Sequence, residues 1–295
     1  MFDFLKKLFL PITATLDFIT KYFKTIVFLT ILYFIFFNAP NEEGIKTELA
    51  NLQKIDLSGP IIDVSKVLEN IEKAKKDEHI KGVLFVVDSP GGAVAPSVEV
   101  AYAIKELSSV KPVVTYASGV IASGSYYASI WSNKIIANPG SIVGSIGVIM
   151  QGFEAGQLLE KIGINAQTVK AGKYKESGTP TRKWTDFEEK QLQSVINDTY
   201  NMFISDVSSA RKLDVKNHTI YADAKIFTSK QAKEVGLVDE VATLNFAKDS
   251  LVELSKVQKP VWKKEDKFEK FMDKFMSEAI SKISIAFSNQ LKAVL

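Results

Sequence analysis

A continuous apolar run, GVLFVVDS at residues 82–89, is the feature that most constrains the fold of this chain. A strand with one solvent-facing side alternates apolar and polar residues, so an unbroken run predicts a strand buried on both faces. Helical apolar spacing occurs on either side of it, at residues 64–77 and 97–107, and a second strand-like run follows at 112–118. This alternation predicts an α/β fold with a largely parallel sheet.

Shorter elements are expected around this centre. Residues 55–62 predict a strand that runs into a turn, and residues 134–150 mix β-branched residues with glycine, which favours short strands and tight turns. Further along, the pattern predicts a helix at 154–164, a strand at 165–172 and a long amphipathic helix at 186–211.

Composition excludes several kinds of site. The chain has no Cys, which excludes disulfides, cysteine nucleophiles, thiolate metal sites and iron–sulfur clusters. Its two histidines, His79 and His218, lie in charged or polar stretches, so we expect no multi-histidine metal centre. The formal net charge of +3 is too small to imply a polyanionic partner such as nucleic acid.

An uncharged stretch near the amino terminus predicts a membrane anchor. No charged residue occurs between Lys24 and Glu42, and residues 25–37 read TIVFLTILYFIFF. The run is shorter than the roughly 20 residues that span a bilayer comfortably, but apolar neighbours extend it. Because lysines precede it and glutamates follow it, residues 1–41 are expected to hold a short cytoplasmic terminus and one transmembrane helix. A cleaved signal peptide and a buried core helix are the alternatives.

The last segment, residues 249–295, has a different pattern. From Asp266 onward, apolar residues recur at helical spacing with Lys and Asp opposite, which predicts an amphipathic helix. Such a helix can pack on its own domain or on a neighbouring subunit, or it can bind a membrane surface. Residues 42–248, between the two terminal segments, are expected to form the α/β domain.

Three segments of this domain mix Gly, Ser and Lys where a core would place only apolar residues. The first, DSPGG at residues 88–92, follows the buried run directly. Its glycines allow backbone N–H groups to point outward, as an oxyanion hole for acyl transfer requires. The alternative is a plain tight turn.

The second segment, SGVIASGSYY at residues 118–127, predicts a strand that ends in a turn before a helix begins. A serine at this helix start would expose its hydroxyl, and the following amide could join the oxyanion hole. An N-cap serine followed by small residues is the alternative. Ser118, Ser123 and Ser125 lie within this segment, so spacing alone leaves the nucleophile ambiguous.

The third segment, KYKE at residues 173–176, is typical of a solvated charge run. A lysine can instead act as a general base when desolvation lowers its pKa toward neutrality. Ser–Lys pairs are a known form of nucleophile activation, and the scarcity of histidine favours one here.

Five motifs together resemble bacterial signal peptide peptidase A (protease IV) in its short, single-repeat form, a family of Ser–Lys serine peptidases related to the ClpP and crotonase folds. The motifs are DSPGGAV (88–94), SGVIASGSYY (118–127), GSIVGSIGVIM (140–150), AGKYKESGTPTR (171–182) and FTSKQAKEVGLVDEV (227–241). The resemblance covers roughly residues 50–245. It implies a ClpP/crotonase-like fold of repeated β-β-α units and a homo-oligomer shaped as a ring or dome.

The resemblance also implies roles for individual residues. Ser123 would be the nucleophile and Lys175 the general base that takes its proton. Ser145 would hydrogen-bond the lysine and help to orient it.

The oxyanion hole would use the backbone amide of Gly124 together with that of Gly91 or Gly92. This chain departs from the family in having Ser125 where a second glycine is usual after the nucleophile. It also has Ala224-Lys225 where Gly-Arg is usual, which bears on architecture more than on catalysis.

The implied function is a membrane-anchored serine endopeptidase that hydrolyses cleaved signal peptides, and other membrane-associated polypeptides, through an acyl-enzyme intermediate. It would need no cofactor or metal. Its catalytic domain is expected on the extracytoplasmic side of the bacterial inner membrane, with a cleft for small or apolar side chains. The alternatives are a crotonase-like acyl-CoA enzyme, a catalytically silent scaffold, and a branch that trims membrane proteins of the stomatin type.

Overall fold

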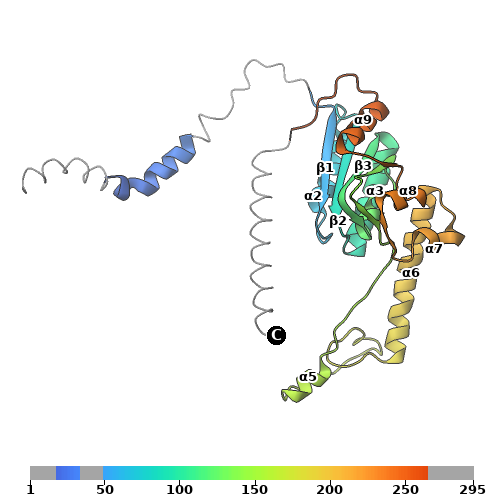
Figure 1. The fold of residues 1–295 in the computed structure, drawn as a ribbon. Coiled ribbons are helices and arrows are strands. Elements are labelled where there is room, and N and C mark those ends of the chain that lie inside the picture. Colours follow the sequence, from blue (N-terminus) through green and yellow to red (C-terminus); the bar gives the residue numbers. More distant parts are fainter. Residues whose placement is uncertain (1–17, 34–48, 265–295) are drawn as a thin grey trace, which may run out of the picture. The chain divides into compact units, whose positions relative to one another are not determined.

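The computed structural model describes residues 18–33 and 49–264, and the chain divides into two compact units between residues 48 and 49 (Figure 1). In the first unit, residues 18–33 form one helix with exposed apolar side chains. Over the described ranges, no helix combines the length and the apolar character that crossing a membrane requires. The expected span at 25–37 continues into residues outside the described part. The amphipathic helix expected from Asp266 lies outside it entirely, so both stay predictions.

The second unit is built on a sheet that has seven strands within residues 49–264. Five of them are parallel neighbours in the order β1 (Leu52–Ser58), β2 (Gly82–Ser89), β3 (Val113–Ala122), β4 (Lys134–Ala137) and β7 (Glu240–Val241). The end of β3 also pairs in parallel with β5 (Ile142–Gly144), which pairs antiparallel with β6 (Ile226–Thr228). The predicted α/β class with a largely parallel sheet is confirmed.

Helices cover both faces of this sheet, which explains the unbroken apolar run of β2. Val83, Phe85 and Val87 point into a core shared with α2 (Ser65–Lys76) and α3 (Val94–Val110). Leu84 points to the opposite face, where it packs with Leu251 of α9 (Leu244–Ser255). All four of these β2 side chains are fully buried. Two covered faces leave no room for polar residues at these four positions.

Five further helices and one 3-10 turn complete residues 49–264. They are α4 (Gly124–Ser129), α5 (Gly156–Lys161), α6 (Asp186–Arg211), the 3-10 turn Val215–Asn217, α7 (His218–Tyr221) and α8 (Ser229–Glu234). The C-terminal half of α6 packs on the core through Phe203, Ile204 and Val207. Its N-terminal end lies away from the sheet (Figure 1). We call residues 150–185, which include α5, the lobe.

The lobe is where the structure departs from the sequence pattern. The strand expected at 165–172 does not form, and the helix expected at 154–164 covers only Gly156–Lys161. A strand needs a neighbouring strand to satisfy its backbone N–H and C=O groups, and the sheet lies too far from the lobe to supply one. Val169 of the expected strand is exposed instead, as is Ile164 at the end of the expected helix.

Candidate active site

Ser123 lies where β3 turns sharply into α4, and its backbone is strained. It has φ 53° and ψ −125°, a combination that residues with a side chain rarely adopt. A strained serine between a strand and a helix is the geometry of a nucleophile elbow, which lifts the hydroxyl out of the sheet edge. Ser123 is accordingly part-exposed, whereas the other residues of 121–127 are buried.

Ser125, the other serine of this turn, has a structural role. Its side chain is fully buried. Its hydroxyl donates to the Ser89 carbonyl at 2.6 Å and accepts the Ala122 N–H at 2.9 Å, so it ties the elbow to the end of β2. Ser118 lies earlier in β3 and donates to the Val87 carbonyl at 3.2 Å. The geometry therefore favours Ser123 among the three serines that spacing left open.

The glycine turn after β2 lies directly against this elbow. A Cβ on Gly91, which has φ +91°, would come within 2.6 Å of the Gly124 nitrogen and 2.9 Å of the Ser123 Cβ. The Gly91 N–H donates to the Ser89 hydroxyl at 3.1 Å. In the described part of the chain, no hydrogen bond uses the Gly92 N–H, and the Gly124 N–H is a first-turn donor with no intrahelical partner. The arrangement favours Gly92 over Gly91 as the second amide beside Gly124.

Strand β5 brings Ser145 to the same place. Ala122 lies opposite Gly144 in the β3–β5 ladder, so Ser123 and Ser145 are the next residues in register. The Ser123 N–H donates to the Gly144 carbonyl at 2.8 Å, and the Ser145 N–H donates to the Lys225 carbonyl at 2.7 Å. Ser145 also has a positive φ of 50°. The structure therefore brings the two predicted site serines together.

A cavity of about 100 Å³ opens beside Ser123. Its apolar wall is formed by Val94, Val98, Val148, Ile149, Met202 and Phe203. Tyr127 also lines it, with its ring 4.8 Å from that of Phe203 and its hydroxyl hydrogen-bonded to Asp206. Burial and the Asp206 carboxylate raise the pKa of Tyr127, so this phenol stays neutral. The size and lining of the cavity suit a small apolar side chain.

Lys175 does not lie in this cavity. It is an exposed residue of the lobe and is not part of the lining beside Ser123. The lobe is attached at Glu188 in the first turn of α6, whereas the cavity begins at Thr199 of the same helix. These two residues are about 16 Å apart along the helix axis at 1.5 Å per residue, which is longer than a lysine side chain. Within one chain, Ser123 and Ser145 therefore come together without Lys175.

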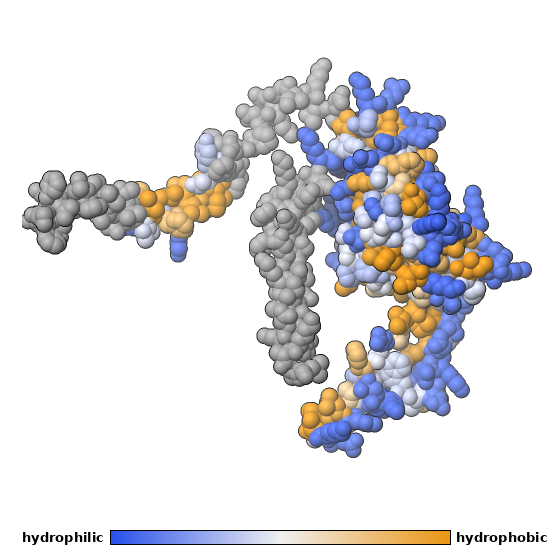
Figure 2. All heavy atoms as spheres, in the orientation of Figure 1, coloured by the Kyte–Doolittle hydropathy of each residue, from blue (hydrophilic) through white to orange (hydrophobic). Residues whose placement is uncertain are grey.

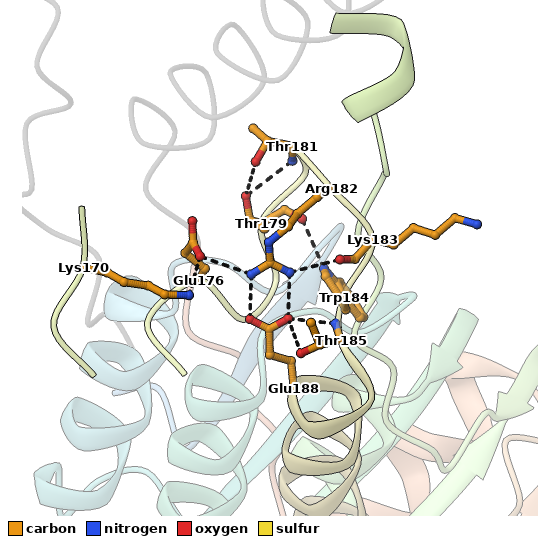
Figure 3. Close-up of polar contacts among 9 residues, drawn as sticks. All are labelled: Lys170, Glu176, Thr179, Thr181, Arg182, Lys183, Trp184, Thr185 and Glu188. Carbon is orange, nitrogen blue, oxygen red and sulfur yellow. Dashed lines mark hydrogen bonds and ion pairs between the residues drawn. The ribbon is translucent and has the colours of Figure 1, made fainter. Parts of the chain in front are cut away.

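An ion-pair network fastens the lobe to α6 (Figure 3). Arg182 donates to both oxygens of Glu188 at 2.9 Å and contacts Glu176 at 3.2 Å. Glu188 also accepts the Thr185 N–H at 2.8 Å, and Lys170 donates to Glu176 at 2.5 Å. The hydrogen bonds that Glu176 accepts, first from Lys170 and then from Thr168 and Arg182, lower its pKa to about 2. Hydrogen bonds from Arg182 and Thr185 lower the pKa of Glu188 as well.

A second hollow, of about 510 Å³, lies within the lobe. It is lined by several charged residues, among them Glu154, Glu160, Glu176, Arg182 and Lys183. Across residues 18–33 and 49–264, no group of three or more His, Cys, Asp or Glu side chains is placed to hold a metal ion.

Comparison with known proteins gives the family. Residues 105–258, which include Ser123, Ser145 and Lys175, match the peptidase family S49 domain. A provisionally named protease of Methanocaldococcus jannaschii is 43% identical over 198 residues, which cover 67% of this chain and 64% of that protein. A provisionally named signal peptide peptidase SppA of Enterococcus faecium is 34% identical over 233 residues, which cover 72% of this chain and 67% of that protein.

Among solved structures, a ClpP1 mutant of Listeria monocytogenes aligns with a TM-score of 0.43 and 16% identity over 66% of this chain and 93% of that one. The finer ClpP/crotonase-like architecture stays an implication of the motifs. The match to the Methanocaldococcus protein leaves part of that relative uncovered. The sequence matches, however, span more than half of this chain. The chain therefore belongs to peptidase family S49, which confirms the expected class of serine endopeptidase.

Proposed function

We propose that this protein is a membrane-anchored homo-oligomeric endopeptidase whose Ser–Lys pair forms between two copies of the chain. Ser123 of one protomer would be the nucleophile, and Lys175 of a neighbouring protomer would be its general base. The observation that carries the proposal is the strained elbow at Ser123. It lies beside a cavity with one apolar wall and two glycine amides that have no hydrogen-bond partner among the described residues.

The chemistry follows from this geometry. Neutral Lys175 accepts the Ser123 proton as the oxygen attacks the scissile carbonyl carbon. The N–H groups of Gly92 and Gly124 stabilise the oxyanion of the tetrahedral intermediate. Its collapse breaks the C–N bond, and the lysine returns the proton to the leaving amine. Water, activated by the same lysine, then hydrolyses the acyl-enzyme.

The position of Lys175 supports a pair formed between copies. Within one chain the lysine is solvent-exposed and is not among the residues that line the cavity beside Ser123. Contact with a second copy would bury the lysine, and burial favours the neutral amine that a base requires. The lobe and the Ser123 cavity are different surfaces, so their contact is head-to-tail, which is the type of interface that the expected ring requires.

Exposed apolar side chains on the lobe support the same contact. Figure 2 shows them gathered at the α5 end. Phe153 and Val169 are 81% and 104% exposed, and Leu158 and Ile162 are more than half exposed. A soluble surface rarely leaves such side chains uncovered unless a partner binds there.

The substrate class follows from the cavity and the anchor. The cavity of about 100 Å³ beside Ser123 has an apolar wall that would accept small apolar side chains, which the cores of signal peptides supply. The apolar run at 25–37 would hold the enzyme at the bacterial inner membrane with its catalytic domain outside the cytoplasm.

The test is the turnover of a signal-peptide-like fluorogenic substrate by the full-length chain in detergent. We expect Ser123→Ala and Lys175→Ala to lose activity by roughly 10³-fold or more, as loss of a nucleophile or its base does. Ser125→Ala is the matched control, two residues from the nucleophile, and should remain active. Cleavage by Ser123→Ala at the parental rate would contradict the proposal.

A further inference from the structure

Both neighbours of Lys175 are held at the start of α6, Tyr174 by direct contact and Glu176 through Arg182. The Tyr174 ring packs edge-on against Phe187, with 5.4 Å between centroids. On the other side, Glu176 contacts Arg182 at 3.2 Å. Among the described residues, the Lys175 ammonium itself has no hydrogen-bond or ion-pair partner, and its side chain is exposed. Lys175 is therefore an exposed lysine without a side-chain partner among the described residues, and it lies between two residues that are held in place.

Arg182 is the centre of this attachment (Figure 3). It binds both oxygens of Glu188, whose side chain is fully buried, and it also reaches Glu176. A bidentate guanidinium–carboxylate pair fixes direction as well as distance, which a single lysine contact does not. A buried ion pair of this kind adds little net stability, so precise placement is the better account of its presence.

We propose that Arg182 is a positioning residue for the general base. Through Glu188 it holds the loop on α6, and through Glu176 it fixes the point from which Lys175 extends. This inference rests on the proposed function, because positioning matters only if Lys175 acts in catalysis. A base that must enter the site of another protomer depends strongly on its starting point, since a misplacement of about 1 Å can cost about 10²-fold in rate.

A double-mutant cycle tests the proposal in the full-length protein. The four chains are the parent, Arg182→Gln, Lys175→Ala and the double variant. We expect Arg182→Gln to lower kcat about 10- to 100-fold with KM nearly unchanged. In the Lys175→Ala background, the same substitution should produce no further loss in the slow labelling of Ser123 by a fluorophosphonate. Arg182→Lys keeps the positive charge but cannot form the bidentate pair with Glu188. Its kcat should lie between those of the parent and Arg182→Gln.

Equal losses in both backgrounds would overturn the proposal, because they would mean general damage to the fold. An unchanged kcat in Arg182→Gln would also overturn it. Glu176→Gln gives an independent readout if Arg182→Gln does not fold, because it weakens the contact next to Lys175 and leaves the buried pair intact. It must show the same dependence on Lys175. Parental activity in Lys175→Ala would instead refute the proposed function, so the two failures are distinguishable.

Discussion

Two inactive variants should restore activity when they share one oligomer. Ser123→Ala keeps the lysine but has no nucleophile, and Lys175→Ala keeps the nucleophile but has no base. If the pair forms between copies, a mixed assembly contains sites in which an intact serine meets an intact lysine. If the pair forms within one chain, no mixture contains such a site.

The size of the effect follows from the geometry. Lys175 lies outside the cavity beside Ser123, and the lobe is attached about 16 Å along α6 from the start of that cavity, so the proposed pair joins two chains. Each site then draws its serine and its lysine from two independent protomers. Random mixing in equal amounts therefore restores about one quarter of the parental sites, and activity should fall away symmetrically on either side of that ratio.

Co-expression of the two variants with different affinity tags, followed by sequential purification on both, isolates mixed assemblies. Hydrolysis of the signal-peptide-like substrate is then compared with the parent and with each variant alone. A mixture of parent and Ser123→Ala is the control, since its activity should follow the parental fraction. Doubly purified assemblies that stay inactive at every ratio would refute pairing between copies.

Four further results are expected. Gly91→Ala should abolish activity, because the added Cβ would lie 2.6 Å from the Gly124 nitrogen. The loss of activity should exceed about 10²-fold, which is the effect of removing one hydrogen-bond donor from an oxyanion hole. Ser125→Ala should lower the free energy of unfolding by about 1–3 kcal/mol, measured in urea, because it leaves buried backbone groups without their hydroxyl partner. Phe203→Ala should enlarge the cavity beside Ser123. In a peptide series, the ratio of kcat/KM for leucine to that for alanine at the cleaved position should rise about tenfold or more. Glu176 has a lowered pKa of about 2, so its ionised form stabilises the lobe above its ordinary pKa of 4.5 and that contribution is lost as pH falls toward 2. Limited proteolysis of the lobe should therefore accelerate across this range in the parent, and Glu176→Gln should show a smaller change; equal pH dependence in the two chains would contradict the assignment.

Elements with strong periodic or continuous patterns were predictable from the sequence. The run at 82–89 is strand β2, and the stretch at 186–211 is helix α6 with the same bounds. Their patterns reflect burial against the rest of the domain, which is locally encoded. The strand expected at 165–172 was wrong because a strand depends on a partner, and the local sequence does not reveal whether one is near.

The candidate site was predictable only in part. The motif resemblance implied Ser123, and the structure adds the strained φ and the buried Ser125 hydroxyl that distinguish the two serines. Met202 and Phe203 of α6 were missed, because their contact with the Ser123 cavity is long-range and leaves no local signal. The Thr185–Glu188 spacing is a readable capping box. It marks a helix start, but not the ion pair with Arg182.

Helix α6 belongs to two sites at once under the proposed arrangement. Its first turn holds the lobe from which Lys175 of one protomer would reach its neighbour, and Thr199, Met202 and Phe203 line the pocket of the same protomer. A helix transmits displacement along its axis with little loss, because its backbone hydrogen bonds resist stretching. A substrate that pushes on one pocket would therefore move the lysine of the next site. In such a ring, substrate binding in each site would be coupled through α6 to the position of the general base in the neighbouring site.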